Sequence, residues 1–260
     1  MVDIDAKNFF NLYMIILDDS KTYPKNIIDQ LNQRKVIDLL MNNLWIENIK
    51  RDRCIVDIFE DVEKYCNNNG IVGFHCTKEI HTKPYHKTGL RILNMRQHHS
   101  EFIQYLKDEL RISKEDIVYF KEKLDYFREN NSEGREGTLW FCLNRNFVGE
   151  DSEDFLKYYG GEAVYFWFKE DRKITKLCKS IGKPVVIEAL IEVSELTIFQ
   201  EYGFGKTLVS NYAHSINKKF HTSDLEGFVK SDIPSKNIIQ VHPKKSFFKK
   251  YHQVRNDFNQ

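Results

Sequence analysis

The sequence lacks the cysteine patterns of disulfide-bonded and thiolate–zinc proteins. It contains five cysteines in 260 residues, an odd number, and no two of them form a C-x-x-C pair. This usage argues against a disulfide framework and against a zinc site built on thiolates. Scattered cysteines of this kind are typical of cytosolic proteins, in which thiols stay reduced.

Long apolar runs are also missing. No segment approaches the roughly 18 consecutive apolar residues that a membrane-spanning helix needs. The chain begins Met1-Val2-Asp3-Ile4-Asp5, with acids where a secretory signal carries bases. We therefore expect a cytoplasmic protein that has no membrane partner.

An excess of charge of either sign is absent. Lysines and arginines number 39 and acidic residues 38, so the formal net charge is +1. This balance excludes a protein that coats nucleic acid through bulk charge, although it is compatible with a local basic groove. The sequence also has no G-x-G-x-x-G segment and no Walker loop, which excludes a Rossmann or P-loop nucleotide site.

Apolar residues make up 41% of the chain, enough to bury a sizeable core. Their three- and four-residue spacing predicts a helical N-terminal extension over residues 1–70. We interpret residues 71–260 as a second domain that carries a helical insertion at about 98–132. Ser113 and Asp116 have the spacing of a cap at the start of the second inserted helix.

Short apolar or alternating runs predict strands in the rest of the chain, at residues 71–77, 138–143, 163–168, 184–193, 226–230 and 238–241. In the fourth run we expect Glu188, followed by Glu192 and Glu195, to lie on a solvent-exposed face. Consecutive strands with few helices between them favour an α+β fold whose sheet is antiparallel or mixed.

Three separated segments carry a further pattern: His75-Cys76-Thr77 followed by Gly89-Leu90, then Gly137-Thr138-Leu139-Trp140-Phe141, then Glu226 followed by Val229, Ile233-Pro234 and Ile238. The first resembles the His-x-Ser/Thr strand, helix and Gly-Leu turn that open the ADP-ribosyltransferase fold. The second is similar to the G-x-x-Y-F strand of poly(ADP-ribose)-polymerase-like transferases. The third is similar to the end of the DNA-targeting ADP-ribosyltransferase toxins of toxin–antitoxin pairs.

This resemblance covers about residues 71–245. It implies a split antiparallel or mixed β-sheet and NAD⁺ as co-substrate, with no metal. His75 and Thr77 would hold the NAD⁺ ribose and the nicotinamide amide through neutral hydrogen bonds, next to the turn at Gly89. The alternative for His75 is a hydrogen-bonded core histidine in an apolar strand.

Aromatic rings are candidates for contact with the cationic nicotinamide ring, because a ring face attracts a cation. Trp140, Phe141 and Tyr158 are the residues we single out. Trp140 departs from the family pattern, which has tyrosine there, so the identity of the stacking ring stays open. Packing in the core is the alternative for each of the three.

A carboxylate is needed to stabilise the positively charged ribose that forms when nicotinamide leaves. The resemblance implies that Glu226 has this role and also accepts the proton of the acceptor. Its rival is Glu162, which follows Gly160-Gly161, a pair that permits an unusual turn. Glu162 would then shape the pocket or orient the acceptor.

Two further clusters contain residue types that can bind metals or nucleic acid. Histidines at 75, 81, 86, 98 and 99 do not have the spacing of a metal site. Basic residues mixed with aromatics near the C-terminus, from Lys244 to Arg255, fit either contact with nucleic acid or an amphipathic helix with a solvated basic face.

The resemblance therefore implies an NAD-dependent ADP-ribosyltransferase that modifies RNA or DNA as a toxin or antiphage effector. Such a protein would have an antitoxin or chaperone as a partner. Three alternatives remain: an NAD glycohydrolase with water as acceptor, a transferase that modifies protein, and an inactive module that binds a nucleotide or a partner.

Overall fold

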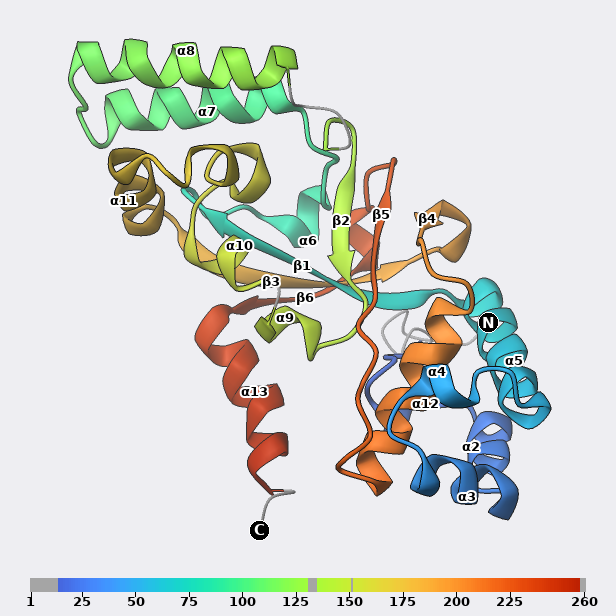
Figure 1. Cartoon of the computed structure of the whole chain (residues 1–260). Helices are drawn as coiled ribbons and strands as arrows, with labels where there is room; N and C mark the ends of the chain where they lie inside the picture. The colour runs from blue at the N-terminus through green and yellow to red at the C-terminus, as the bar shows by residue number, and fades with distance from the viewer. Residues whose placement is uncertain (1–13, 131–134, 151, 258–260) are drawn as a thin grey trace, which may run out of the picture. The chain divides into compact units, whose positions relative to one another are not determined.

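A computed structural model describes residues 14–130, 135–150 and 152–257 of the chain. The fold is α+β, with helices and a six-stranded antiparallel sheet in the order β4-β5-β2-β1-β3-β6 (Figure 1). This confirms the predicted α+β class, and of the two predicted kinds of sheet, antiparallel or mixed, the structure has the antiparallel one.

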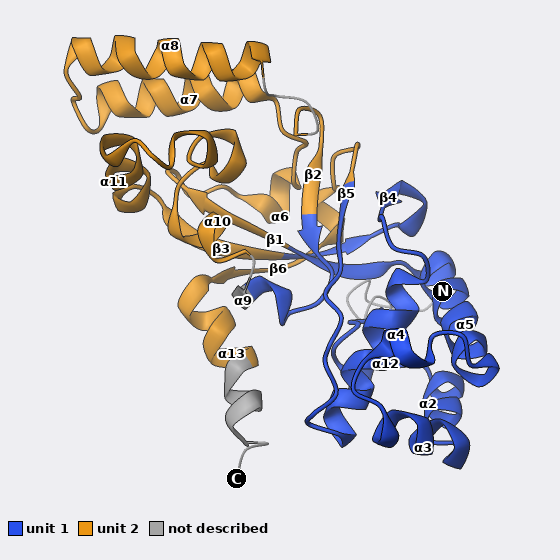
Figure 2. Cartoon of the chain, in the orientation of Figure 1, with its two compact units in different colours: residues 1–74, 141–150, 188–228 blue, residues 75–140, 151–187, 229–260 orange. Residues whose placement is uncertain are grey.

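The chain divides into two compact units, drawn in different colours in Figure 2. Unit 1 comprises residues 1–74, 141–150 and 188–228, and unit 2 comprises residues 75–140, 151–187 and 229–260. The chain therefore passes between the units several times. The domain boundary predicted at residue 70 stays a prediction.

The helices predicted before residue 70 are confirmed in unit 1: α2 (Lys25–Leu31), α3 (Arg34–Asn42), α4 (Ile46–Ile49) and α5 (Arg53–Asn69). The ends of α5 follow local sequence. The Asp52 carboxylate accepts a hydrogen bond from the Cys54 amide at its start, and Gly70 ends it with a φ of 78°. The predicted helical structure in residues 1–13 lies outside the described residues.

Unit 1 also contains α12 (Gly203–Ile216), a helix that the sequence did not predict. Most of its residues are buried, so it lacks the polar face that marks a surface helix. Gly205 lies against α5, and a Cβ there would be 2.7 Å from the Phe59 Cα. The close packing of α12 on α5 thus requires a glycine at position 205. Glycine is a poor helix former, so its presence weakens the helical pattern in the sequence.

Five of the six predicted strands are confirmed, as β1 (Ile71–Glu79), β2 (Leu139–Cys142), β3 (Lys183–Ile191), β5 (Glu226–Val229) and β6 (Ile238–Pro243). β1 and β2 are antiparallel, with Phe74 opposite Cys142. The two-residue strand β4 (Leu196–Thr197) was not predicted.

The strand predicted at residues 163–168 is wrong. The chain there forms two 3₁₀ turns, Gly161–Ala163 and Phe166–Phe168. Gly160 and Gly161, with φ values of 77° and 43°, turn the backbone away from an extended path. Phe166 and Trp167 remain 43% and 45% exposed, so this aromatic run is no buried strand.

The prediction that β3 has a solvent-exposed face is also wrong. Glu188 is 5% exposed, and its neighbours Ile187 and Ala189 are fully buried. β3 is therefore covered on both faces, and the alternation of glutamate with apolar residues does not mark a wet side there. Glu192 and Glu195 are exposed, but they follow the strand.

The helices of unit 2 are α6 (Tyr85–Thr88), α7 (Met95–Asp108), α8 (Lys114–Asn130), α10 (Glu153–Lys157), α11 (Arg172–Ser180) and α13 (Lys244–Asp257), and unit 1 contains α9 (Phe147–Glu150). The pair α7 and α8 confirms the predicted insertion (Figure 1). The Ser113 hydroxyl accepts the Asp116 amide hydrogen at 3.1 Å, which confirms the predicted cap.

Unit 2 has its own core, in which α7 and α8 pack against α11 through Phe102, Leu106, Phe120, Leu124 and Ile174. Lys78 on β1 joins this core at the end of α11. Its buried ammonium donates to the carbonyl oxygens of Lys157, Cys178 and Lys179 at 3.1, 3.2 and 2.9 Å. A cation thus occupies the C-terminal end of a helix, where carbonyls lack partners.

Among the described helices, none has both the length and the apolar character needed to cross a membrane.

Candidate functional site

The eight predicted site residues are distributed over both units. His75, Thr77, Gly89, Trp140, Tyr158 and Glu162 belong to unit 2, and Phe141 and Glu226 belong to unit 1.

His75 lies on β1, and its Nδ1 is 2.9 Å from the carbonyl oxygen of Trp140 on β2. A carbonyl only accepts, so Nδ1 carries the hydrogen and Nε2 is the acceptor nitrogen. Burial lowers the pKa of the imidazole, and the charge of Lys83 lowers it further. His75 is therefore held neutral, in one tautomer, as the predicted contact with NAD⁺ requires.

Thr77 lies two residues beyond His75 on the same strand, so the two side chains point to the same face of β1. Thr77 is partly exposed, and its hydroxyl makes no hydrogen bond within the described part of the chain. A hydroxyl in this state can donate to or accept from a ligand at low cost.

Trp140 is partly exposed on β2, and its indole N–H donates to the Thr138 hydroxyl at 3.1 Å. The Arg135 guanidinium lies over the ring, with Cζ 4.1 Å from the ring centroid. One face of the predicted nicotinamide platform thus already contacts a cation. Stacking of nicotinamide on that face requires Arg135 to move.

Arg135 also forms an ion pair with Glu162. Both side chains are about a quarter exposed, 29% and 27%, so the pair is only partly screened by water. Trp140, Arg135 and Glu162 therefore form a continuous cluster, which we call the Arg135 cluster. The sequence did not single out Arg135, because nothing in the spacing places it beside residues 140 and 162.

Glu162 owes its position to the glycine pair that precedes it. Gly160 adopts a left-handed conformation, and a Cβ there would be 2.5 Å from the Val164 Cβ. A Cβ at Gly161 would be 2.5 Å from the Phe155 ring. The unusual turn predicted from this pair is present, and packing within unit 2 explains why both positions are glycine.

Gly89 ends α6 with a φ of 72° and approaches another segment of unit 2 closely. A Cβ there would be 2.1 Å from the Ile233 carbonyl oxygen. The next residue, Leu90, exchanges two backbone hydrogen bonds with Ile233, at 2.9 and 2.8 Å. The Gly-Leu turn and the Ile233-Pro234 segment are therefore paired, although they are far apart in the sequence.

Two of the predicted aromatic residues have partners that do not involve the Arg135 cluster. Tyr158 stacks on Tyr165, with ring centroids 3.8 Å apart and an interplanar angle of 7°. Phe141 is 2% exposed and packs against Gly73, where a Cβ would be 3.2 Å from the Phe141 Cβ. These contacts favour packing as the role of both residues and leave Trp140 as the better candidate for ligand contact.

Glu226 is exposed at the first position of β5 in unit 1. The segment before it is fixed by Asn144, a fully buried residue. Asn144 donates from its amide to the Asp224 carboxylate at 2.9 Å and accepts the Leu225 amide hydrogen at 3.2 Å. These hydrogen bonds hold the backbone just before an exposed carboxylate at the start of a late strand.

Two other histidines of unit 2, His98 and His99, have structural partners. His99 donates from Nε2 to the Ala163 carbonyl at 2.7 Å, and burial lowers its pKa. His98 stacks on Tyr159 with ring centroids 5.5 Å apart. Throughout residues 14–130, 135–150 and 152–257, no group of three or more His, Cys, Asp or Glu side chains is placed to hold a metal ion.

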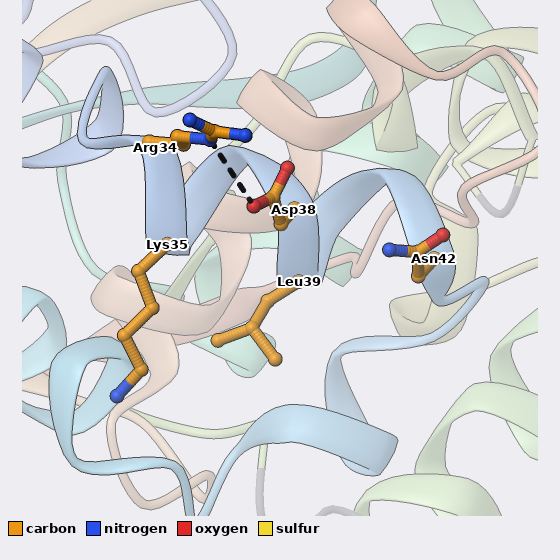
Figure 3. A pocket seen from close by; sticks show the side chains of 5 residues that line it. All are labelled: Arg34, Lys35, Asp38, Leu39 and Asn42. Carbon is orange, nitrogen blue, oxygen red and sulfur yellow. Dashed lines mark ion pairs between the residues drawn. The ribbon is translucent and has the colours of Figure 1, made fainter.

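A hollow of about 430 Å³ lies on α3 in unit 1 and is lined by Arg34, Lys35, Asp38, Leu39 and Asn42 (Figure 3). All five residues come from this one helix, and only Leu39 is partly buried. An ion pair joins Arg34 and Asp38 at 4.0 Å. None of these residues belongs to the predicted site, and one helix face offers no enclosing wall for a ligand.

Comparisons with protein-family models, with curated proteins and with solved structures found no match to this chain.

Proposed function

We propose that this protein transfers ADP-ribose from NAD⁺ to a nucleic acid. The observation that carries the proposal is the pairing of Leu90 with Ile233, which brings the opening and closing segments of the ADP-ribosyltransferase resemblance together in unit 2. His75 lies on the strand that leads into this pairing. A contact between two short motifs that are far apart in the sequence is stronger support for the resemblance than either motif alone.

The position of Glu226 supports the same proposal. Glu226 is the first residue of β5, so a glutamate opens a late strand as the resemblance implies. The sequence also continues from β1 into a helix and then the Gly89-Leu90 turn, as in the family pattern. These features support an ADP-ribosyltransferase-type core.

The chain's own residues suggest a division of roles. Neutral His75, with Nε2 as acceptor, and the Thr77 hydroxyl would hold a ribose hydroxyl and the nicotinamide amide. NAD⁺ supplies the ADP-ribosyl group and a neutral leaving amide. A carboxylate, Glu226 or Glu162, would stabilise the positive ribose and accept the proton of the attacking acceptor atom.

The surroundings of the two glutamates favour Glu226 as the carboxylate that stabilises the positive ribose and accepts the proton. Glu162 is already paired with Arg135, so its charge is partly neutralised before any ligand binds. Glu226 is exposed at the start of its strand. Glu162 then has a positioning role through Arg135 and Trp140. A toxin or antiphage effector with an antitoxin partner is the biological setting that the resemblance suggests.

Incubation with labelled NAD⁺ tests the proposal. Label should enter RNA or DNA added to the reaction. Free ADP-ribose as sole product would identify a glycohydrolase, label in protein would identify a protein-modifying transferase, and no turnover with any acceptor would indicate an inactive binding module.

The catalytic acid is tested by substitution in the same assay. Glu226→Gln should lower turnover by about 10²-fold or more while NAD⁺ affinity changes little. Glu201→Gln, at an exposed position of the same unit, is the matched control and should keep full activity. Full activity of Glu226→Gln together with loss in Glu162→Gln would transfer the role to Glu162.

A further inference from the structure

A hollow of about 400 Å³ lies in unit 1, where the end of α12 meets the turn between α3 and α4. It is lined by Trp45, His214, Lys218, Lys219, Phe220, His221, Thr222 and Asp224. None of these residues belongs to the predicted site. They come from two chain segments more than 160 residues apart.

The backbone around this hollow is fixed. The Asn217 side-chain amide donates to the carbonyls of Leu40 and Asn43, at 3.1 and 3.3 Å. The His221 amide donates to the Leu44 carbonyl at 2.8 Å, and His214 Nδ1 donates to the Phe220 carbonyl, also at 2.8 Å. The loop after α12 is therefore held against the end of α3, and its side chains are preorganised for a ligand.

Two aromatic rings lie face to face beside the hollow, and we call this stacked pair the Trp45–His221 platform. The rings of Trp45 and His221 are stacked, with centroids 3.6 Å apart and an interplanar angle of 4°. Trp45 is nevertheless 50% exposed, and His221 is exposed as well. Two apolar residues that shortly precede Trp45 in the sequence, Met41 and Leu44, are 50% and 44% exposed. An indole kept in water beside further apolar surface marks a contact surface rather than a core.

Positive charge lies next to this platform. Lys218 and Lys219 follow the C-terminal end of α12 and are both exposed. Asp224 is the single carboxylate of the lining, and its Oδ1 accepts a hydrogen bond from Asn144. The hollow therefore combines a planar aromatic surface with a net positive edge.

We propose that this surface binds single-stranded nucleic acid, with a base stacked on the Trp45–His221 pair and backbone phosphates beside Lys218 and Lys219. Unpaired bases stack on exposed aromatic rings, and lysines neutralise the adjoining phosphates. An acidic peptide would satisfy the lysines but would leave the flat ring face without a planar partner. The inference goes beyond the proposed transfer reaction, because binding at this surface needs no NAD⁺.

Fluorescence anisotropy with a fluorescein-labelled 12-nucleotide RNA and the matching DNA tests this surface on the full chain without NAD⁺. We expect Trp45→Ala to weaken binding by about tenfold and Trp45→Phe, which keeps a ring, to retain most of it. A plot of log K for binding against log salt concentration has a negative slope. The double variant Lys218→Gln/Lys219→Gln should make this slope less steep by about 1.4, because each lost phosphate contact accounts for roughly 0.7.

The matched control removes the same charge elsewhere in unit 1. Arg34→Gln/Lys35→Gln, in the first turn of α3, should change the Kd by less than about twofold. Polyphosphate, which has no bases, should bind Trp45→Ala as well as the unchanged protein. Equal oligonucleotide affinity of Trp45→Ala and the unchanged protein would overturn the proposal. A loss of polyphosphate binding in Trp45→Ala equal to that for RNA would also overturn it.

Discussion

Leu90 and Ile233 exchange both backbone hydrogen bonds, at 2.9 and 2.8 Å, within unit 2. The bond pair is possible because Gly89 has no side chain, since a Cβ there would be 2.1 Å from the Ile233 oxygen. Asp232 adds a third contact by accepting the Ile92 amide hydrogen at 2.9 Å. The segment that follows the strand carrying His75 is thus bonded to residues 232–233 beside a glycine turn.

Gly89→Ala should therefore lower the free energy of unfolding by at least about 2 kcal/mol. The new side chain strains the backbone at a positive φ and also clashes with the Ile233 carbonyl, and these two costs add. Chemical denaturation measures this loss. Gly137→Ala is the matched control, since Gly137 also has a positive φ, 67°. Among the described residues other than its two chain neighbours, no heavy atom lies within 4 Å of the added Cβ. Equal losses in the two variants would show that close approach to Ile233 plays no part.

Lys78→Met tests the buried ammonium at the end of α11. The substitution leaves the carbonyls of Lys157, Cys178 and Lys179 without their donor, so we expect a loss of roughly 2–4 kcal/mol in the free energy of unfolding. Lys87→Met, at an exposed position of unit 2, should change stability by less than about 0.5 kcal/mol. A loss at residue 78 no larger than this control would contradict the capping role.

The pH dependence of stability should depend on His98. Its Nε2 is buried and has no hydrogen-bond partner within the described residues, and burial lowers the pKa of the ring from 6.5 to about 4. Between these pH values the unfolded chain binds a proton that the folded chain does not. The free energy of unfolding should therefore fall as the pH drops from about 6.5 to 4, by up to roughly 3 kcal/mol.

His98→Phe keeps a ring stacked on Tyr159 and removes the titration. Denaturation at pH 7 and pH 4.5 should show a smaller loss of stability in this variant than in the unchanged protein. His86→Gln, at an exposed position, should keep the full pH dependence. The same loss in His98→Phe and the unchanged protein would exclude His98 as the source.

Much of the fold was predictable because its sequence signals are local. β1 and β3 are apolar runs bounded by polar residues and glycine, and α5 begins at an aspartate cap and ends at a glycine. Such patterns depend on a few neighbouring residues. Five of the six predicted strands, and the predicted N-terminal helices within the described residues, are accordingly confirmed.

Errors arose where tertiary contacts decide the structure. α12 contains Gly205 because α5 lies against it, and the run at 163–168 turns because Gly160 and Gly161 adopt positive φ values. Arg135 joins Trp140 to Glu162 only through this turn, so no spacing in the sequence reveals the cluster. The Trp45–His221 platform likewise depends on a loop that Asn217 holds to α3.

NAD⁺ binding measured by isothermal titration calorimetry tests the central claim most directly. We predict saturable binding to the unchanged protein, weakened about tenfold or more in His75→Ala, because loss of a fixed neutral hydrogen-bonding group removes about 1.4 kcal/mol or more. His86→Ala, exposed in the same unit, should bind NAD⁺ with unchanged affinity. No saturable binding to the unchanged protein, or equal affinity in a folded His75→Ala variant, would contradict the proposed site.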